Sequence, residues 1–237
     1  MRLASKTLLT LSLVAMSQLS VAQQTNDLST EVELGAIFTT GNTEDENVKY
    51  KVAVDWLRTN WDYQFSTEGF RSSKQNVLAA QRLYHVARGR RNLTEDTYWE
   101  ARGAYEDDRF SGYDYQADAT VSYGRKFLQN VNNMNLNANF GVGYRRSEST
   151  ADQFSEAIVR VAGEYEWGLS ETASFIQNLS VESGKETSIL RSESAIESEI
   201  MENLALRFSI KAKHQTEVPL TREKTDTETA VTLVWNF

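Results

Sequence analysis

The side chains best suited to proton transfer are the two histidines of the chain, His85 and His214. A histidine next to a carboxylate can act as a general base, and Asp226 comes near His214 if the segments on either side of 216–225 pair. The sequence shows no further constellation around either histidine, so we expect no catalytic residue. A histidine in water at the end of a strand is the simpler interpretation of His214.

Two acidic runs offer the chemistry of a cation site. They are "TEDEN" at 43–47 and "EDD" at 106–108, and their carboxylates could bind Ca²⁺ loosely. Carboxylates in solvated loops explain these runs equally well. The chain has no cysteine, and no histidine or acidic cluster has the spacing of a zinc site. We therefore expect neither a metal nor a cofactor.

A third group of charged side chains occupies every second position of segments rich in aromatic and aliphatic residues. Lys49 and Lys51, for example, alternate with Val48, Tyr50 and Val52. If these segments are strands of one sheet, opposite charges on neighbouring strands can pair across the ladder. The set expected to face the inside is Lys49, Lys51, Asp62, Glu68, Glu100, Arg102, Arg160, Glu164, Glu197, Arg207, Lys211, Lys213 and Glu228.

The elements that must position these charges are predicted by a period of two residues, which is typical of a β-strand with one apolar and one polar face. Twelve such segments are expected, at 30–39, 46–57, 60–70, 77–91, 96–107, 113–127, 134–146, 154–167, 172–183, 189–200, 203–215 and 226–237. In the fourth, Arg82 and Arg88 share a face with Tyr84 and Val86. The pattern therefore leaves open which of its faces points inward.

The connections between these segments alternate in length. Those after even-numbered segments are short, with the one at 128–133 somewhat longer, and those after odd-numbered segments are mostly longer and polar. An even number of strands with short turns at one end and long loops at the other is typical of an outer-membrane β-barrel. A soluble sandwich also alternates, but it does not need strands of such uniform length.

Aromatic residues favour the membrane barrel. All five tryptophans lie on apolar faces and, if the chain runs up and down, at the short-turn end: Trp56, Trp61, Trp99, Trp167 and Trp235. The same faces at the loop end carry Phe38, Tyr105, Tyr113, Tyr115 and Tyr144. Two aromatic girdles around an apolar band are expected where a barrel crosses the two membrane interfaces. A soluble core would scatter its tryptophans along the strands.

The first 22 residues predict export. Arg2 and Lys6 precede the apolar stretch 8–16, and Ser20 and Ala22 suit a signal-peptide cleavage site. We therefore expect a signal peptide at 1–22, a short periplasmic stub at 23–29 and a barrel at 30–237. Cleavage would change the net charge from −8 to −10, which argues against nucleic acid as a partner.

The chain ends on the alternating stretch "VTLVWNF", with Val231, Leu233, Trp235 and Phe237 on one face. Chain ends usually fray, and a frayed end needs no apolar face. We expect this segment to close the barrel against the first strand, with its apolar face in membrane lipid. A terminal aromatic residue resembles the signal that the outer-membrane assembly machinery reads, so Phe237 is the predicted assembly signal and that machinery a predicted partner.

Three stretches resemble the family of YdiY-like, salt-induced outer membrane proteins, which is defined by a domain of unknown function. They are "LGAIFTTGNTEDENVKYKV", "YEDDRFSGYDYQADATVSYGRKF" and "TEVPLTREKTDTETAVTLVWNF", in this order and spacing. The resemblance spans residues 30 to 237 and implies a barrel, a cell outer membrane location and a link to salt stress. It implies no activity and no catalytic residue.

These patterns predict a non-enzymatic outer-membrane barrel, either a narrow or charge-plugged channel or a structural protein. A lipid-modifying enzyme acting on phospholipid or lipid A is the main alternative, and a periplasmic β-protein is the third. A porin specialised for sugar acids would show an excess of basic residues inside, which this set lacks. Pore width, solute and oligomeric state are not predicted.

Overall fold

The computed structural model describes residues 27–40, 46–74, 77–108, 111–149, 153–219 and 222–237. Within these ranges, 38–40, 46–47, 71–74, 77–80 and 130 are described by their backbone alone. The predicted signal peptide at 1–22 and the segment "TEDEN" lie outside the described side chains, as does the ring of Phe38. Their roles stay predictions.

All the regular elements of the described residues are β-strands. None of these residues forms a helix long and apolar enough to cross a bilayer. The strands are β1 (Asp27–Thr40), β2 (Glu46–Arg58), β3 (Trp61–Lys74), β4 (Val77–Asn92), β5 (Thr97–Asp108), β6 (Tyr113–Val131), β7 (Met134–Glu148), β8 (Gln153–Gly168), β9 (Ala173–Ser183), β10 (Ser188–Met201), β11 (Leu204–Gln215) and β12 (Thr225–Asn236).

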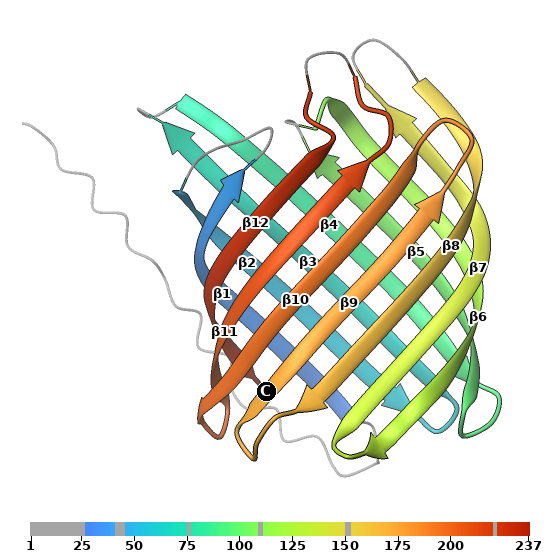
Figure 1. The fold of residues 1–237 in the computed structure, drawn as a ribbon, viewed down its shortest axis with the longest axis vertical. Coiled ribbons are helices and arrows are strands. Elements are labelled where there is room, and N and C mark those ends of the chain that lie inside the picture. The colour runs from blue at the N-terminus through green and yellow to red at the C-terminus, as the bar shows by residue number, and fades with distance from the viewer. Residues whose placement is uncertain (1–26, 41–45, 75–76, 109–110, 150–152, 220–221) are drawn as a thin grey trace, which may run out of the picture.

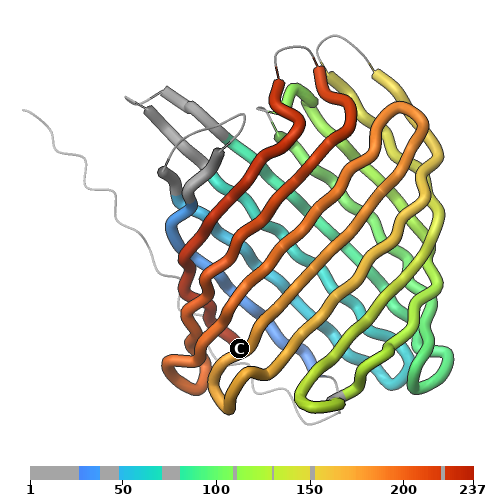
Figure 2. Tube along the Cα trace, in the orientation of Figure 1, coloured from blue at the N-terminus to red at the C-terminus, as the bar shows by residue number. Residues whose placement is uncertain are grey.

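Each strand pairs antiparallel with the next, and β12 returns to pair with β1, so the sheet is a closed barrel (Figure 1). The strands are tilted, and those of the near and far walls cross in projection (Figure 2). At the seam Leu34 lies opposite Leu233, and Thr30 and Phe237 exchange two backbone hydrogen bonds of 3.0 and 2.9 Å. The apolar C-terminal segment therefore closes the barrel, as its sequence predicts.

The connections at one end of the barrel have two or four residues, and the other end carries the longest ones, 41–45 and 216–224. We call these the short-turn end and the loop end. The predicted strand boundaries hold within a few residues, with two informative differences. β1 begins at Asp27 rather than residue 30, because its pairing with β2 continues to Asp27 opposite Leu57. This takes 27–29 out of the predicted stub.

The connection predicted at 128–133 is a two-residue turn. β6 runs on to Val131 through two register shifts, which break the alternation that a sequence pattern can detect. Asn132 and Asn133 have φ of 55° and 59°. A two-residue hairpin turn with positive φ at both positions matches the twist of the strands, and asparagine tolerates this conformation.

One aromatic prediction is wrong. Tyr113 faces the inside rather than the predicted outer girdle, because a register shift between β5 and β6 places an extra β6 residue between Tyr113 and Gln116. Its ring is buried and meets Phe154 edge-on, and its hydroxyl donates to the carbonyl of Glu217 at 3.5 Å. Tyr105 and Tyr144 are exposed on the outside, as predicted.

The wall itself is shaped by close contacts between tyrosines and glycines on neighbouring strands. Tyr98 of β5 pairs with Gly124 of β6, and a Cβ built on Gly124 would lie 2.2 Å from Cζ of Tyr98. The tyrosine ring therefore lies flat over the glycine on the inner face. Only a residue without a side chain leaves this space.

We expect Gly124→Ala to lower the free energy of unfolding by about 1–3 kcal/mol, since the added methyl must displace the Tyr98 ring. The matched control is Gly103→Ala on β5, where the nearest atom to an added Cβ is 4.0 Å away. That change should be neutral or stabilise by up to about 1 kcal/mol. Urea unfolding of the refolded barrels measures both. Equal effects would contradict the close contact.

Candidate functional site

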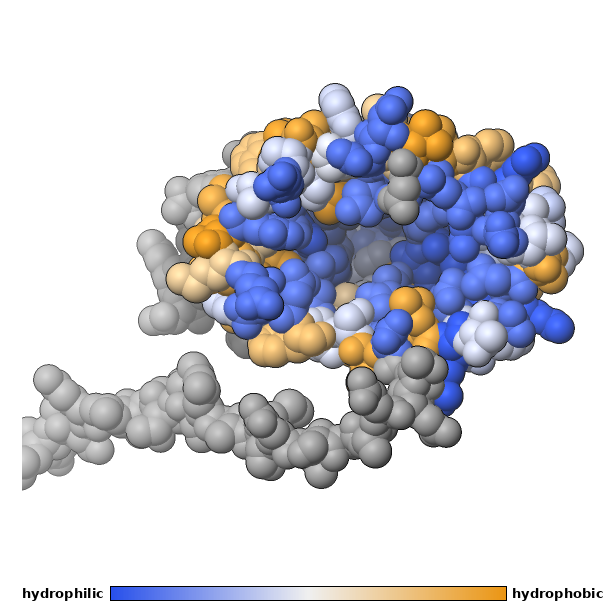
Figure 3. Space-filling model, turned by 90° about the horizontal axis from the view of Figure 1, so that it is seen from below, coloured by the Kyte–Doolittle hydropathy of each residue, from blue (hydrophilic) through white to orange (hydrophobic). Residues whose placement is uncertain are grey.

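The inside of the barrel holds a polar cavity of about 690 Å³. Its lining runs from Leu57, Asp62 and Asn135, next to the short turns, to Lys213 and Glu228 toward the loop end. Seen from the short-turn end, hydrophilic residues surround a central hollow and hydrophobic residues lie on the outside (Figure 3). The cavity is therefore a water-accessible chamber that opens at the short-turn end.

Most of the charged residues singled out from the sequence line this chamber. They are Lys51, Asp62, Glu68, Arg102, Arg160, Glu164, Glu197, Arg207, Lys211, Lys213 and Glu228. The other two, Lys49 and Glu100, are buried in ion pairs at the wall. Cations and anions both line the chamber in number, so its wall has no strong excess of either sign.

The structure also settles the face of β4. Tyr84 lies opposite Glu68 of β3, so Arg82, Arg88 and Arg90 point inward with it. The sequence pattern contained these residues on one face but could not orient it. Arg191 is a further inward charge outside the predicted set, although it continues the alternation of its strand. Glu106, which shares the predicted inward face of β5 with Glu100 and Arg102, also lines the chamber.

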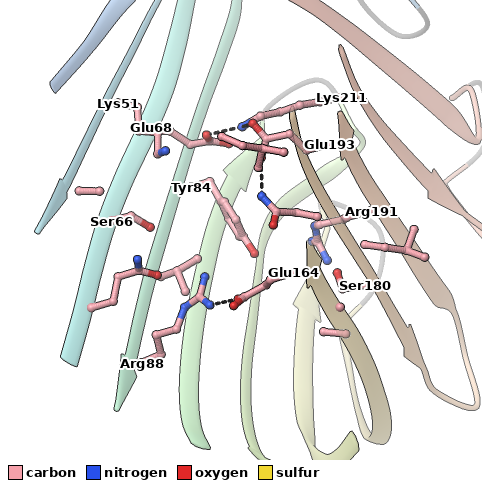
Figure 4. Close-up of a pocket in the computed structure, with 18 of the residues that line it drawn as sticks. Lys51, Ser66, Glu68, Tyr84, Arg88, Glu164, Ser180, Arg191, Glu193 and Lys211 are labelled. Atoms are coloured by element: carbon pink, nitrogen blue, oxygen red, sulfur yellow. Dashed lines mark hydrogen bonds and ion pairs between the residues drawn. The ribbon is translucent and has the colours of Figure 1, made fainter. Parts of the chain in front are cut away.

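Ion pairs cross the lumen toward the short-turn end and near its middle. Glu164 of β8 receives Arg88 and, at 2.7 Å, Arg90 from β4. Nearer the middle, Lys211 of β11 lies 2.5 Å from Glu68 of β3. Figure 4 shows the Lys211–Glu68 and Arg88–Glu164 pairs spanning the chamber. Each pair joins strands that are four apart around the barrel, so it bridges the interior.

A further group of ion pairs lies toward the loop end and joins the strands that are most distant from one another around the barrel. Glu106 of β5 lies 2.8 Å from Lys213 of β11 and 2.8 Å from Arg191 of β10. β5 and β11 are six strands apart in a ring of twelve, so they are on opposite walls. Arg82 of β4 also pairs with Glu228 of β12. We call these four groups of contacts the cross-lumen ion pairs.

A separate cluster braces the seam. Arg207 of β11 reaches across β12 to Glu31 and Glu33 of β1, at 2.9 and 3.0 Å, and also pairs with Glu197 of β10. It can pass because the inward side chain of β12 beside it is the small Thr232, whose hydroxyl donates to Glu33 at 2.8 Å. Side-chain charges thus tie β1, β10 and β11 together where the chain closes, and the Thr232 hydroxyl adds β12.

At the loop end, several connections of the described residues interlock. Arg145 and Glu156, both buried, pair at 2.6 Å, and Glu156 accepts the backbone N–H of Glu186 in the β9–β10 connection. Thr187 of that connection donates to the carbonyl of Glu217 in the β11–β12 connection at 3.2 Å. A Cβ on Gly112, which follows β5, would lie 3.0 Å from side-chain atoms of Pro219 and Arg222. Connections from opposite walls therefore meet above the cross-lumen ion pairs.

The histidines are not assembled into a catalytic group. His85 points outward and its ring stacks on Tyr105, with centroids 6.4 Å apart. His214 also points outward, and its Nδ1 lies 2.8 Å from the hydroxyl of Thr225. Asp226, the carboxylate proposed to approach it, sits opposite Lys213 on the inward face. Among the described residues, no group of three or more histidine and acidic side chains could hold a metal.

The five tryptophans lie near the short-turn end of their strands. Trp56, Trp61, Trp99 and Trp167 are exposed and Trp235 is half-buried. Several stack on neighbouring rings, as Trp61 does on Tyr63 at 5.7 Å and Trp99 on Tyr123 at 5.6 Å. The rings therefore form an outward aromatic belt at one end of the wall.

A closed antiparallel sheet with an apolar outside and a charged interior defines a porin-like transmembrane β-barrel of the outer-membrane type. The chain belongs to the family described as "Protein of unknown function, DUF481", whose model matches residues 32–237. It is 26% identical over 205 residues to the uncharacterized protein YdiY of Escherichia coli (strain K12), covering 86% of this chain and 81% of YdiY. The family resemblance read from the sequence is confirmed.

Two solved barrels are similar in fold. The NanC porin has a TM-score of 0.59 and 7% identity, with 86% of this chain and 98% of the porin covered. The translocator domain of the autotransporter NalP from Neisseria meningitidis has a TM-score of 0.53 and 10% identity, with 91% and 90% covered. At such low identities the likeness shows the barrel fold alone.

The cross-lumen ion pairs make a prediction about stability. Glu106→Gln leaves Lys213 and Arg191 without their shared buried carboxylate, so we expect a loss of about 3–5 kcal/mol in the free energy of unfolding. Glu186→Gln is the control, because its pair with Lys185 is exposed and contributes at most about 1 kcal/mol. Urea unfolding of the refolded proteins measures both. Similar losses would show that Glu106 does not hold the two walls together.

Proposed function

We propose that this chain is an integral outer-membrane protein that forms a narrow channel closed by its cross-lumen ion pairs. The observation that carries this proposal is a polar chamber that opens at one end and is spanned by Glu106, Lys213 and Arg191 near the other. A purely structural barrel needs no chamber, whereas a conducting path needs one. Charges of both signs along the path suit small hydrated ions or zwitterionic solutes rather than a strongly anionic substrate.

The proposed location follows from the outer surface and the N-terminus. Export by a signal peptide at 1–22 would deliver the chain to the cell envelope, and the apolar wall would then meet lipid. The tryptophan belt, in this orientation, lies at the periplasmic interface. A lipid-modifying enzyme remains the alternative, but neither His85 nor His214 contacts the chamber or a carboxylate partner in the described residues.

The proposal also predicts how the closed state depends on salt concentration. Ion pairs across a water-filled lumen weaken as ionic strength rises, because mobile ions screen the attraction. A barrel closed by such pairs would open more readily at high salt, which is a physical basis for the link to salt stress that the sequence resemblance implies.

Single-channel recording tests the closed lumen. Wild-type protein should conduct little, and Lys211→Glu with Lys213→Glu should raise its conductance several-fold. The double change sets new carboxylates beside Glu193 and Glu228 and opposite Glu68 and Glu106, so like charges push the walls apart. As the KCl concentration rises, the conductance of the wild-type channel should also increase more steeply than the conductivity of the bulk solution.

Lys185→Glu with Lys224→Glu is the control for that experiment, since both lysines are exposed at the loop end and the charge change is the same. A large, stable wild-type conductance would contradict the closed lumen. Hydrolysis of phospholipid or lipid A that His85→Ala or His214→Ala abolishes would replace the channel by the enzyme.

The C-terminal residue tests the location and the assembly signal together. In cells the full chain should fractionate with the outer membrane and resist carbonate extraction, and Phe237→Ala should lower the amount inserted. The variant keeps both backbone hydrogen bonds to Thr30 and loses a ring that is 71% exposed, so its stability after refolding should fall by less than about 1 kcal/mol.

Asn236→Ala is the control, because it changes an exposed neighbour in the same strand without removing the terminal ring. If Phe237→Ala inserted as well as the full chain, Phe237 would not be the assembly signal. Recovery of the full chain in the soluble periplasmic fraction would contradict the membrane location.

A further inference from the structure

Three arginines point outward at the short-turn end of one half of the barrel. Arg58 ends β2, Arg91 lies one residue before the end of β4, and Arg125 of β6 lies opposite Thr97 at the start of β5. All three are exposed. Unlike the arginines of the lumen, they face the side of the wall that carries the tryptophan belt.

Each of these guanidinium groups contacts an aromatic ring. Arg58 lies 4.4 Å from the ring centroid of Trp56, Arg91 lies 5.9 Å from that of Trp61, and Arg125 lies 5.8 Å from that of Phe127. Stacking on a ring holds a guanidinium in place but leaves its N–H donors in the plane of the group unused. The rings thus hold the arginines in position and leave their guanidinium N–H donors available.

No carboxylate neutralises them among the described residues. The ion pairs of the barrel involve other cations, and Asp55 of β2 and Asp62 of β3 point into the chamber. The acids closest along the chain are Glu95 and Asp96 of the turn after β4, and the carboxylate of Asp96 accepts a hydrogen bond of 2.5 Å from Gln129. The three positive charges therefore remain available to an external anion.

The strand register places four of these residues in one row. Arg58 lies opposite Trp61, Trp61 lies opposite Arg91, and Arg91 lies opposite Trp99, so arginine and tryptophan alternate across four strands. The Cα atoms of Arg58 and Arg91 are therefore about 10 Å apart, and Arg125 lies two residues beyond Tyr123, the residue opposite Trp99. We call Arg58, Trp61, Arg91, Trp99 and Arg125 the arginine–aromatic patch.

The patch is confined to one half of the barrel. At the short-turn end, the outward positions of β7 to β12 carry no lysine or arginine but only residues such as Leu136, Trp167, Phe175, Ile200 and Trp235. A general requirement for basic residues at a membrane interface would not produce this asymmetry.

We propose that the arginine–aromatic patch binds the phosphodiester headgroup of an anionic glycerophospholipid in the leaflet at the short-turn end. Guanidinium groups bind phosphate oxygens through paired N–H donors, and tryptophan sits at headgroup depth beside the glycerol and upper acyl chains. The absence of carboxylates favours a lipid with net negative charge over a zwitterionic one. This site rests on the proposed membrane location but not on conduction.

Native mass spectrometry of the full refolded chain in detergent tests the site, with phosphatidylglycerol and phosphatidylcholine as probes. We expect phosphatidylglycerol to bind more tightly. Arg58→Gln with Arg91→Gln should weaken its binding about 25-fold, because each arginine near a membrane surface contributes about fivefold, equivalent to about 1 kcal/mol. The variant's binding of phosphatidylcholine should change little.

Arg146→Gln with Lys185→Gln is the matched control, since it removes two exposed positive charges at the loop end. Equal binding of the two lipids by the wild type, or equal losses in both double variants, would overturn the site. So would a dimer without bound lipid that depends on Arg58 and Arg91, because the patch would then join two copies of the chain. Heat-modifiable mobility shows that each variant is folded.

A second measurement distinguishes failure of the proposed lipid site from failure of the proposed membrane location. Tryptophan fluorescence of the wild type in vesicles of brominated phosphatidylcholine should be quenched if the wall lies in lipid. Quenching without a preference for phosphatidylglycerol would overturn the site and leave the location intact. Absence of quenching would overturn both.

Discussion

The structure depends on one constraint, the pairing of every backbone N–H and C=O group in the wall. A sheet in a membrane cannot leave an edge, because water is absent there and an unpaired polar group costs several kcal/mol. Twelve strands meet this constraint only because β12 returns to β1 in register, from Glu31 opposite Asn236 to Thr40 opposite Thr227. The C-terminal strand is therefore as necessary as any in the middle, although a chain end is usually the first part of a protein to fray.

Closure determines what the side chains can do. Successive residues of a strand point to opposite faces, so a closed sheet sends one set to the outside and the other to a shared interior. Charged residues on the inner set are confined within reach of the opposite wall. Desolvation makes an unpaired charge costly there. Lys213 and Arg191 accordingly form ion pairs with Glu106, and Arg82 forms one with Glu228. The cross-lumen ion pairs are a consequence of closing a narrow barrel around charged strands.

The two ends of the barrel are consequently different. At the loop end, Arg145 and Glu156 hold the β9–β10 connection, which in turn contacts the β11–β12 connection through Thr187 and Glu217. At the short-turn end the tight hairpins leave the lumen uncovered, and the chamber opens there. The two ends of the barrel are therefore not equivalent, and the tryptophan belt and the arginine–aromatic patch lie at the short-turn end, where the chamber opens.

The sequence by itself determined the class of fold, the number of strands and the face of most side chains, because these depend on local alternation such as that of "VKYKVAVDW". It also indicated which charges face inward and where the tryptophans lie. It did not determine the face of β4, whose arginines, tyrosine and valine suit either side. The inward turn of Tyr113 was decided by a register shift. Only the tertiary structure decided that Lys213 meets Glu106 from the opposite wall, because that contact joins residues more than one hundred positions apart through the curvature of a closed sheet.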